Sequence, residues 1–173
     1  MAITLTKTQE AFELLFGSLC DQSFSKSLQL EYWGERNLLP LVRTFLLGYF
    51  GKSIEPEAQA TLPGALTGKG RLDFIIDNVA VEFAVRTPGC SSYKLGCITN
   101  ESEIKKLLKY DGKSILVLFD FSNNPLKSEE LEIFRDLPSL GQGNHKKSPF
   151  QLSYFFKKDN GEVGHIKKQI RVN

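Results

Sequence analysis

Cysteine and histidine are scarce in this sequence of 173 residues. The chain has three cysteines, Cys20, Cys90 and Cys97, and two histidines, His145 and His165. An odd number of cysteines without a C-x-x-C pair indicates neither a disulfide framework nor a zinc site, so free thiols are expected. The two histidines lie far apart in the sequence without ligand spacing around them, and we expect both to be solvated.

Long apolar runs and a strong charge bias are also absent. No stretch approaches the roughly 20 apolar residues that a membrane-spanning helix needs, and the first residues lack the basic segment and apolar core of a secretion signal. We therefore expect no membrane association and a cytoplasmic location. The formal net charge of +2 does not by itself indicate a nucleic-acid partner, although it allows a locally basic face.

The length and composition indicate one folded domain over residues 1–173. Hydrophobic residues make up 41% of the chain and charged residues 24%, which is close to globular averages and argues against extended disorder. A chain of this length buries roughly two-thirds of its unfolded surface in a single core. No internal repeat or second domain is visible.

The sequence does contain a hairpin pattern with charges at selected positions. Residues 70–86 form two apolar-rich strands around the turn-prone pair Asp77-Asn78. A two-residue loop there places Asp73 directly opposite Glu82, and like charges at such a position are destabilising. Three explanations stay open: a divalent cation bridges the carboxylates, one carboxylate is protonated, or the register is offset by one residue.

Helices and strands alternate through the rest of the chain. Apolar residues at helical spacing predict two helices before the hairpin and two after it, and a kink or a restart of the helix at Pro40. Shorter apolar runs predict a strand before the hairpin, a strand covered on both faces and a C-terminal hairpin. This order predicts an α/β fold with a mixed central sheet flanked by helices. The predicted helices are 6–20, 28–50, 100–110 and 128–137, and the predicted strands are 53–62, 114–121, 151–157 and 163–172.

Together these features resemble the PD-(D/E)XK nuclease superfamily, which has the restriction-endonuclease-like fold. The resemblance covers about residues 31–120. It consists of an acid on the helix before the hairpin, Asp73 in its first strand and Glu82 in its second, followed by a helix and a buried strand. The helix acid is Glu35 or Glu31, and the sequence leaves both choices open.

The resemblance implies metal-assisted hydrolysis of a nucleic acid, with DNA as the expected substrate. It implies that Asp73 and Glu82 bind Mg²⁺ or Mn²⁺, and that Glu35 joins them directly or through water. Oxygen ligands of this kind suit Mg²⁺, which keeps several waters. Small nucleases of this fold often act as dimers, so a homodimer is a further expectation.

The sequence departs from the family pattern where the pattern has a lysine. Two residues after Glu82 stands Ala84, so the cation that orients the attacking water must come from elsewhere. The candidates for it are Arg86 on the same strand, Arg71 in the position that the register places opposite Ala84, and Lys105 and Lys109 on the following helix. An arginine stabilises charge but does not act as a base, because it stays protonated in proteins.

Two functions of different class follow from this departure. One is an active nuclease with a relocated cation, and the other is a catalytically inactive module of the same fold that binds nucleic acid or a protein partner. In both, the expected contacts to nucleic acid are Lys69, Arg71, Lys94 and Lys105. A third possibility is that the hairpin is ordinary structure.

Overall fold

Two buried parallel strands form the centre of the fold in the computed structural model, which describes residues 2–29, 33–62, 68–88, 99–137 and 147–172. Strand β5 (Val79–Arg86) is buried at every position, and β6 (Lys113–Asp120) is buried at every position after its first residue. They pair in parallel from Val79↔Lys113 to Arg86↔Asp120. Burial on both faces explains why these segments are nearly continuous apolar runs.

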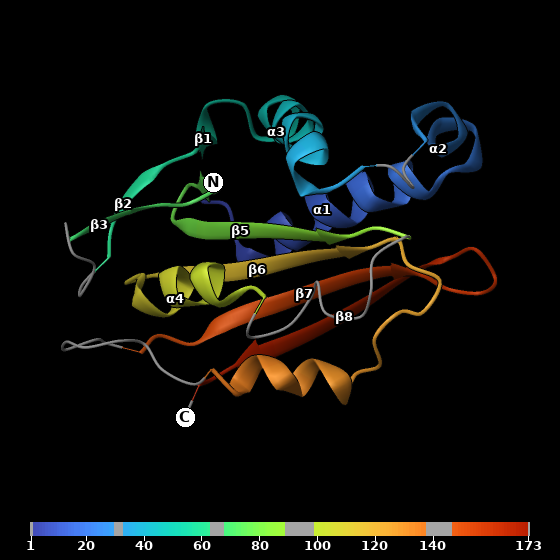
Figure 1. Cartoon of the computed structure of the whole chain (residues 1–173). Helices are drawn as coiled ribbons and strands as arrows, with labels where there is room; N and C mark the ends of the chain where they lie inside the picture. Colours follow the sequence, from blue (N-terminus) through green and yellow to red (C-terminus); the bar gives the residue numbers. More distant parts are fainter. Residues whose placement is uncertain (1, 30–32, 63–67, 89–98, 138–146, 173) are drawn as a thin grey trace.

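The main sheet has six strands in the order β1-β4-β5-β6-β7-β8 (Figure 1). The pairs β5·β6 and β6·β7 are parallel, whereas the pairs β1·β4, β4·β5 and β7·β8 are antiparallel. The mixed central sheet of an α/β fold is thereby confirmed. The other four strands are β1 (Ile54–Pro56), β4 (Phe74–Ile76), β7 (Phe150–Lys157) and β8 (Val163–Ile170).

The predicted register of the central hairpin is confirmed where β4 pairs with β5. Phe74 lies opposite Val81, and Ile76 lies opposite Val79. Asp77 makes the turn with a φ of 56°, in the left-handed region that Asp tolerates better than most residues. The paired ladder ends at Phe74, so Asp73 stands one residue outside it.

The start of the predicted hairpin, at Gly70 and Arg71, is not part of the main sheet. Residues Lys69–Arg71 form β3, which pairs with β2 (Gln59–Thr61) in a separate two-stranded sheet. Arg71 therefore lies opposite Gln59 instead of Ala84. The chain leaves the main sheet because Glu57, with a φ of 52°, interrupts the predicted strand 53–62 between β1 and β2.

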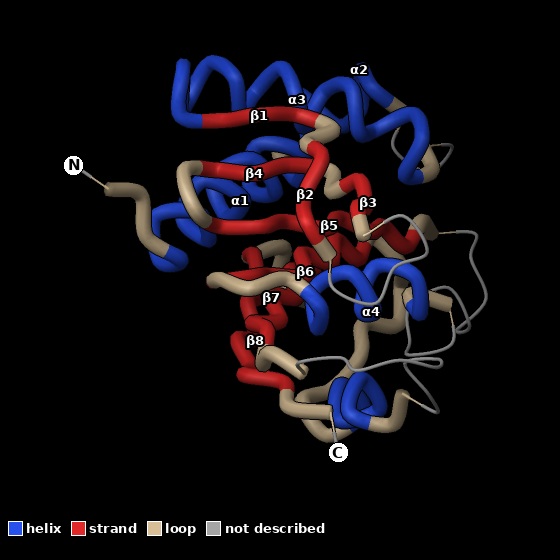
Figure 2. The backbone as a smooth tube through the Cα atoms, turned by 90° about the vertical axis from the view of Figure 1, so that its left-hand side faces the viewer, coloured by secondary structure: helices blue, strands red, loops and turns tan. Residues whose placement is uncertain are grey.

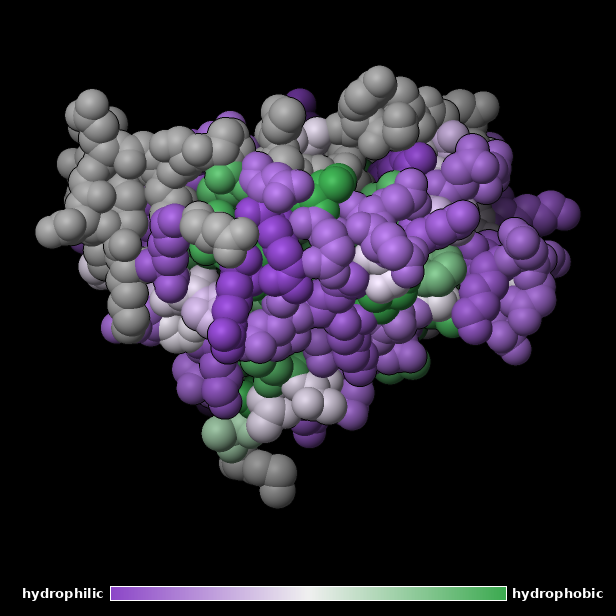
Figure 3. Space-filling model, turned by 90° about the horizontal axis from the view of Figure 1, so that it is seen from below, coloured by the Kyte–Doolittle hydropathy of each residue, from purple (hydrophilic) through white to green (hydrophobic). Residues whose placement is uncertain are grey.

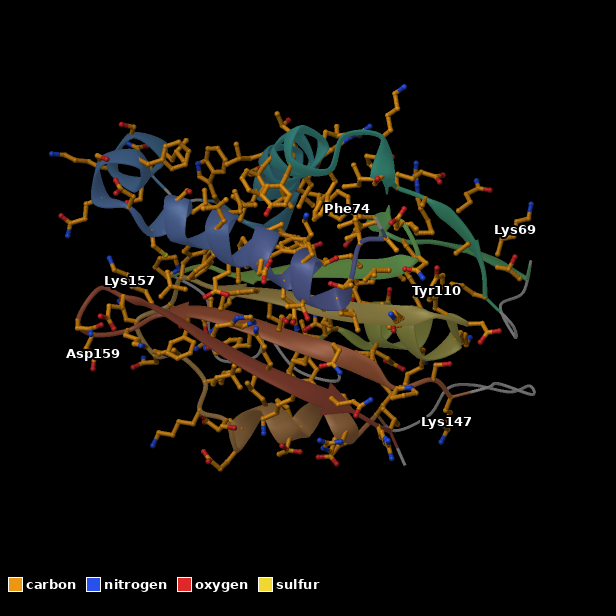
Figure 4. The ribbon with its side chains drawn as sticks, turned by 180° about the vertical axis from the view of Figure 1, so that it is seen from behind. Lys69, Phe74, Tyr110, Lys147, Lys157 and Asp159 are labelled. Carbon is orange, nitrogen blue, oxygen red and sulfur yellow. The ribbon has the colours of Figure 1, made fainter. Side chains whose placement is uncertain are left out.

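The helices cover both faces of the sheet (Figures 1 and 4). On one face, α1 (Leu5–Cys20) and α3 (Glu35–Phe50) pack on a core around Phe119, whose ring contacts those of Phe16 and Phe83 at centroid distances of 4.9 and 5.0 Å. On the other face, α4 (Glu101–Lys109) and the 3₁₀-helix η4 (Glu130–Arg135) cover a second core.

Two helix predictions need correction. The segment 28–50 is not one kinked helix, because α2 (Gln22–Leu28) ends before α3 begins at Glu35 and Pro40 lies inside α3. The segment 128–137 forms a 3₁₀-helix instead of an α-helix. A further short 3₁₀-helix, η2 (Gly51–Ser53), leads from α3 into β1.

The surface beneath η4 and β8 is largely hydrophilic, with small apolar areas between the polar side chains (Figure 3). Within the described ranges, no helix combines the length and the apolar character needed to cross a bilayer.

Candidate active site

Asp73 immediately precedes β4 and lies beside β5, the second strand of the hairpin. Its carboxylate Oδ2 accepts a hydrogen bond of 2.8 Å from the backbone N–H of Phe83. Burial raises the pKa of Asp73, and the hydrogen bond from Phe83 opposes that rise. The side chain is therefore fixed against β5, close to the second acid of the predicted pair.

Glu82 is a buried carboxylate in the middle of β5. Its side chain is 1% exposed and lies on the face of the sheet that α4 covers, as do Ala84 and Arg86 at the next alternate positions. Burial, followed by the negative charge of Asp73, raises the pKa of Glu82 to about 9. A buried charge of this kind needs a partner.

Lys106 on α4 is that partner. Its Nζ donates hydrogen bonds to both carboxylate oxygens of Glu82, at 3.0 Å and 2.9 Å. Helix α4 holds the lysine there because Ile104, Leu107 and Leu108 are buried against the sheet. The structure thus places an ammonium group beside Glu82, although this chain has Ala84 where the family pattern has a lysine. The group comes from Lys106, which was not among the cations expected from the sequence.

One feature of the sequence indicates that Lys105 is less available than Lys106 to contact Glu82. Glu101 and Lys105 are four residues apart with the acid first, which favours an ion pair on one helix face. The structure contains this pair, with Lys105 Nζ at 2.5 Å from Glu101 Oε1. The spacing therefore indicates that Lys105 is already engaged.

Glu35, at the start of α3, is the third acid near this site. Glu35, Asp73 and Glu82 are called the acidic cluster below. Much of the residue is exposed, but its carboxyl group is partly removed from water by the surrounding protein. This desolvation raises the pKa of Glu35 to about 7, and the charges of Asp73 and Glu103 add to the rise. Lys106 acts in the opposite direction on the same carboxyl group. Of the two helix acids that the sequence left open, Glu35 is thus in the electrostatic field of Asp73, and Glu31 lies outside the described residues.

Arg86 is engaged at the far end of β5. Its Nη1 lies 3.0 Å from Asp120 Oδ2 and donates a hydrogen bond of 3.0 Å to the carbonyl of Asn124. Tyr154 donates a hydrogen bond of 2.5 Å to the same carboxylate. Arg86 is four residues along an extended strand from Glu82, or roughly 13 Å, so this buried network does not bring its guanidinium to the acidic cluster.

The other predicted cations lie around the site. Arg71 forms a 2.7 Å ion pair with Glu57, and the two side chains are 69% and 49% exposed. Lys69 is exposed on β3, and Lys109 ends α4. Lys94 falls outside the described residues. A role for these residues in catalysis or nucleic-acid binding stays a prediction.

The acidic cluster suits a hard divalent cation. Within the described ranges, no three His, Cys, Asp or Glu side chains converge closely enough to enclose a metal ion. Mg²⁺ seldom needs such a cage, because it is usually held by one or two carboxylates and completed by waters and substrate phosphates. Asp73 and Glu82 offer only oxygen donors, and Lys106 offsets the charge of Glu82. These residues therefore fit Mg²⁺ or Mn²⁺.

The metal-free protein is expected to lose stability as the pH rises. The pKa of Glu82 is about 9 in the folded chain against 4.5 for a free glutamate, so between these values the folded state holds a proton that the unfolded state has released. Raising the pH from 5 to 9 through this window lowers the free energy of unfolding, by an amount on the order of 5 kcal/mol. Urea unfolding in EDTA at pH 5, 7 and 9 measures this, and an equal decline in a Glu82→Gln variant would contradict it.

Comparison with known proteins gives little beyond this geometry. No family model and no curated protein matches the sequence. Among solved structures, the chain is similar to SfsA of Pyrococcus furiosus, whose structure is a complex with Ca²⁺. The TM-score is 0.34 and the identity 13%, over 80% of this chain and 65% of SfsA, so the match spans less than two-thirds of that protein. Similarity at this level does not establish a family.

Proposed function

We propose that this chain is a metal-dependent nuclease that hydrolyses phosphodiester bonds, with DNA as its expected substrate and Lys106 as its relocated lysine. The observation that supports this proposal best is the contact of the Lys106 ammonium with both oxygens of the buried Glu82. A purely structural acid on an inner strand would be costly to bury with two further acids, Asp73 and Glu103, in its field. Such an arrangement is typical of a site that binds a cation.

Asp73 and Glu82 would hold the Mg²⁺ or Mn²⁺ ion, and Glu35 would join them directly or through water. The bound ion supplies Lewis-acid polarisation of the phosphate and a lowered pKa for a bound water. The fold of the chain holds the two carboxylate ligands, Asp73 and Glu82, in fixed positions. The hydrogen bond from Phe83 N–H orients Asp73, and the packing of β5 between two layers of helices holds Glu82.

Lys106 would orient the attacking water and stabilise the charge that develops on the phosphate. Its ammonium group has three N–H donors, two of which are directed at Glu82. The remaining donor is available to a water or a phosphate oxygen, since the lysine side chain is 28% exposed. A fixed donor of this kind in a largely dehydrated site stabilises transition-state charge more than it would in water.

A cleavage assay tests the proposal. Plasmid, single-stranded DNA, flapped DNA and RNA are incubated with the protein in Mg²⁺, in Mn²⁺ and in EDTA. We expect cleavage of at least one substrate in the presence of a divalent cation and none in EDTA. Binding of nucleic acid or of a protein partner without any cleavage would favour the alternative, a catalytically inactive module of this fold.

A further inference from the structure

A groove runs beside the acidic cluster, between α3 and the segments that end β1 and precede β4. Its volume is about 400 Å³, and Asp73 lines it together with residues of both sides. Figure 2 shows α3 above β1 and β4, with α4 on the other side of β5. Phe74, labelled in Figure 4, lies below α3 and contributes to the apolar lining. The groove thus leads directly to one of the proposed metal ligands.

Two arginines on α3 line this groove. Arg36 and Arg43 are seven residues apart on the helix, which is about two turns or roughly 10 Å. Both are exposed, and neither has an ion pair or hydrogen bond with any of the residues that the structure describes. They therefore present unused guanidinium groups along the same side of the groove.

The charges in the groove favour an anionic ligand. The acids that line it are Glu57 and Asp73. Glu57 is paired with Arg71 at 2.7 Å, so Asp73 is the one remaining acid in the lining and faces two arginines. The lining therefore keeps an excess of positive charge even without a metal ion, and the planar guanidinium group matches the geometry of a phosphate.

We propose that this groove binds the sugar–phosphate backbone of a single nucleic-acid strand, with Arg36 and Arg43 contacting phosphates next to the bond that is cut. A volume of about 400 Å³ is in the size range of a site for one small ligand, which suits the backbone of one strand better than the body of a duplex. The position relative to the cut bond rests on the proposed function, whereas binding of the strand does not.

Fluorescence anisotropy with a labelled 12-nucleotide thymidine oligomer in EDTA tests this proposal without cleavage. Each of the variants Arg36→Ala and Arg43→Ala is expected to weaken binding roughly tenfold. The double variant should reduce the slope of log K against log salt by about 1.4, because two phosphate contacts to a single strand are lost. The double lysine variant, Arg36→Lys with Arg43→Lys, keeps both charges and should retain most of that slope.

Arg171→Ala is the matched control, since it removes the same charge from an exposed position after β8, at the opposite edge of the sheet. It is expected to leave the salt slope unchanged. An unchanged slope in the double alanine variant would overturn the proposed groove contacts, and a blunt duplex binding as tightly as the oligomer would overturn the single-strand preference. Arginine-dependent binding without cleavage in Mn²⁺ would sustain the groove as a binding site and reject the nuclease.

Discussion

Replacing Lys106 with alanine is expected to lower kcat for nucleic-acid cleavage by about 10²–10³-fold, the usual loss when one fixed donor to a developing charge is removed. The variant lacks the ammonium that contacts both oxygens of Glu82. Glu82 then remains buried without the cation that lowers its pKa, and its affinity for protons rises further. Single-turnover rates with saturating Mn²⁺ measure the effect.

Two further lysine variants separate the roles of charge and proton transfer. Lys106→Arg keeps the positive charge but cannot deprotonate, so a large loss in this variant indicates proton transfer and a small one indicates charge stabilisation. Lys105→Ala tests the rival position on α4, and we expect a much smaller loss because its ammonium is held by Glu101. A Lys106→Ala variant that is folded by circular dichroism and cleaves at the wild-type rate would contradict the assignment.

Replacing Arg86 with alanine is expected to destabilise the fold by about 3–5 kcal/mol, because it leaves a buried carboxylate without its cation. Asp120 is fully buried, and the arginine is 4% exposed. Asp120 also accepts hydrogen bonds from Ser122 N–H and from Tyr154. The loss would therefore affect side chains of three neighbouring strands, β5, β6 and β7. Urea unfolding measures it as a lower midpoint.

An exposed ion pair gives the comparison for Arg86. Arg71→Ala breaks the pair with Glu57, whose side chains are largely in water, and should cost less than about 1 kcal/mol. If Arg86 is structural, the double variant Arg86→Met with Asp120→Leu should regain much of the stability that Arg86→Ala loses, since no buried charge is left. An Arg86→Ala variant of normal stability that has lost cleavage would instead return Arg86 to the catalytic role expected from the sequence.

The central strands were predictable because their patterns depend on local chemistry. The turn at Asp77 and the apolar residues on each side of it define the register of β4 and β5, which the structure confirms. The run of residues 114–121 matches β6 to within one residue at each end. The departure of β3 into its own sheet was not predictable in this way. It depends on a reversal at Glu57, a residue whose left-handed conformation has no clear signal in the sequence.

The acids of the site were also predictable, but the lysine was not. Asp73 and Glu82 follow from strand register, which spacing along the chain determines. Lys106 comes from a separate element, and its reach to Glu82 depends on how α4 rotates when its apolar residues pack on the sheet. At 100° per residue, Lys105 lies nearer than Lys106 to the buried face of α4, so the helical pattern alone does not predict that Lys106 is the lysine that contacts Glu82.

The initial rate of strand cleavage in Mn²⁺ and in EDTA, for wild type and for Asp73→Asn, tests the central claim most directly. Asn keeps the size of the side chain and removes the charge that would bind the cation. We expect cleavage by the wild type in Mn²⁺ alone and no cleavage by the variant under either condition. Cleavage by Asp73→Asn at the wild-type rate, or wild-type cleavage that persists in EDTA, would contradict the role of Asp73 as a ligand of a catalytic cation.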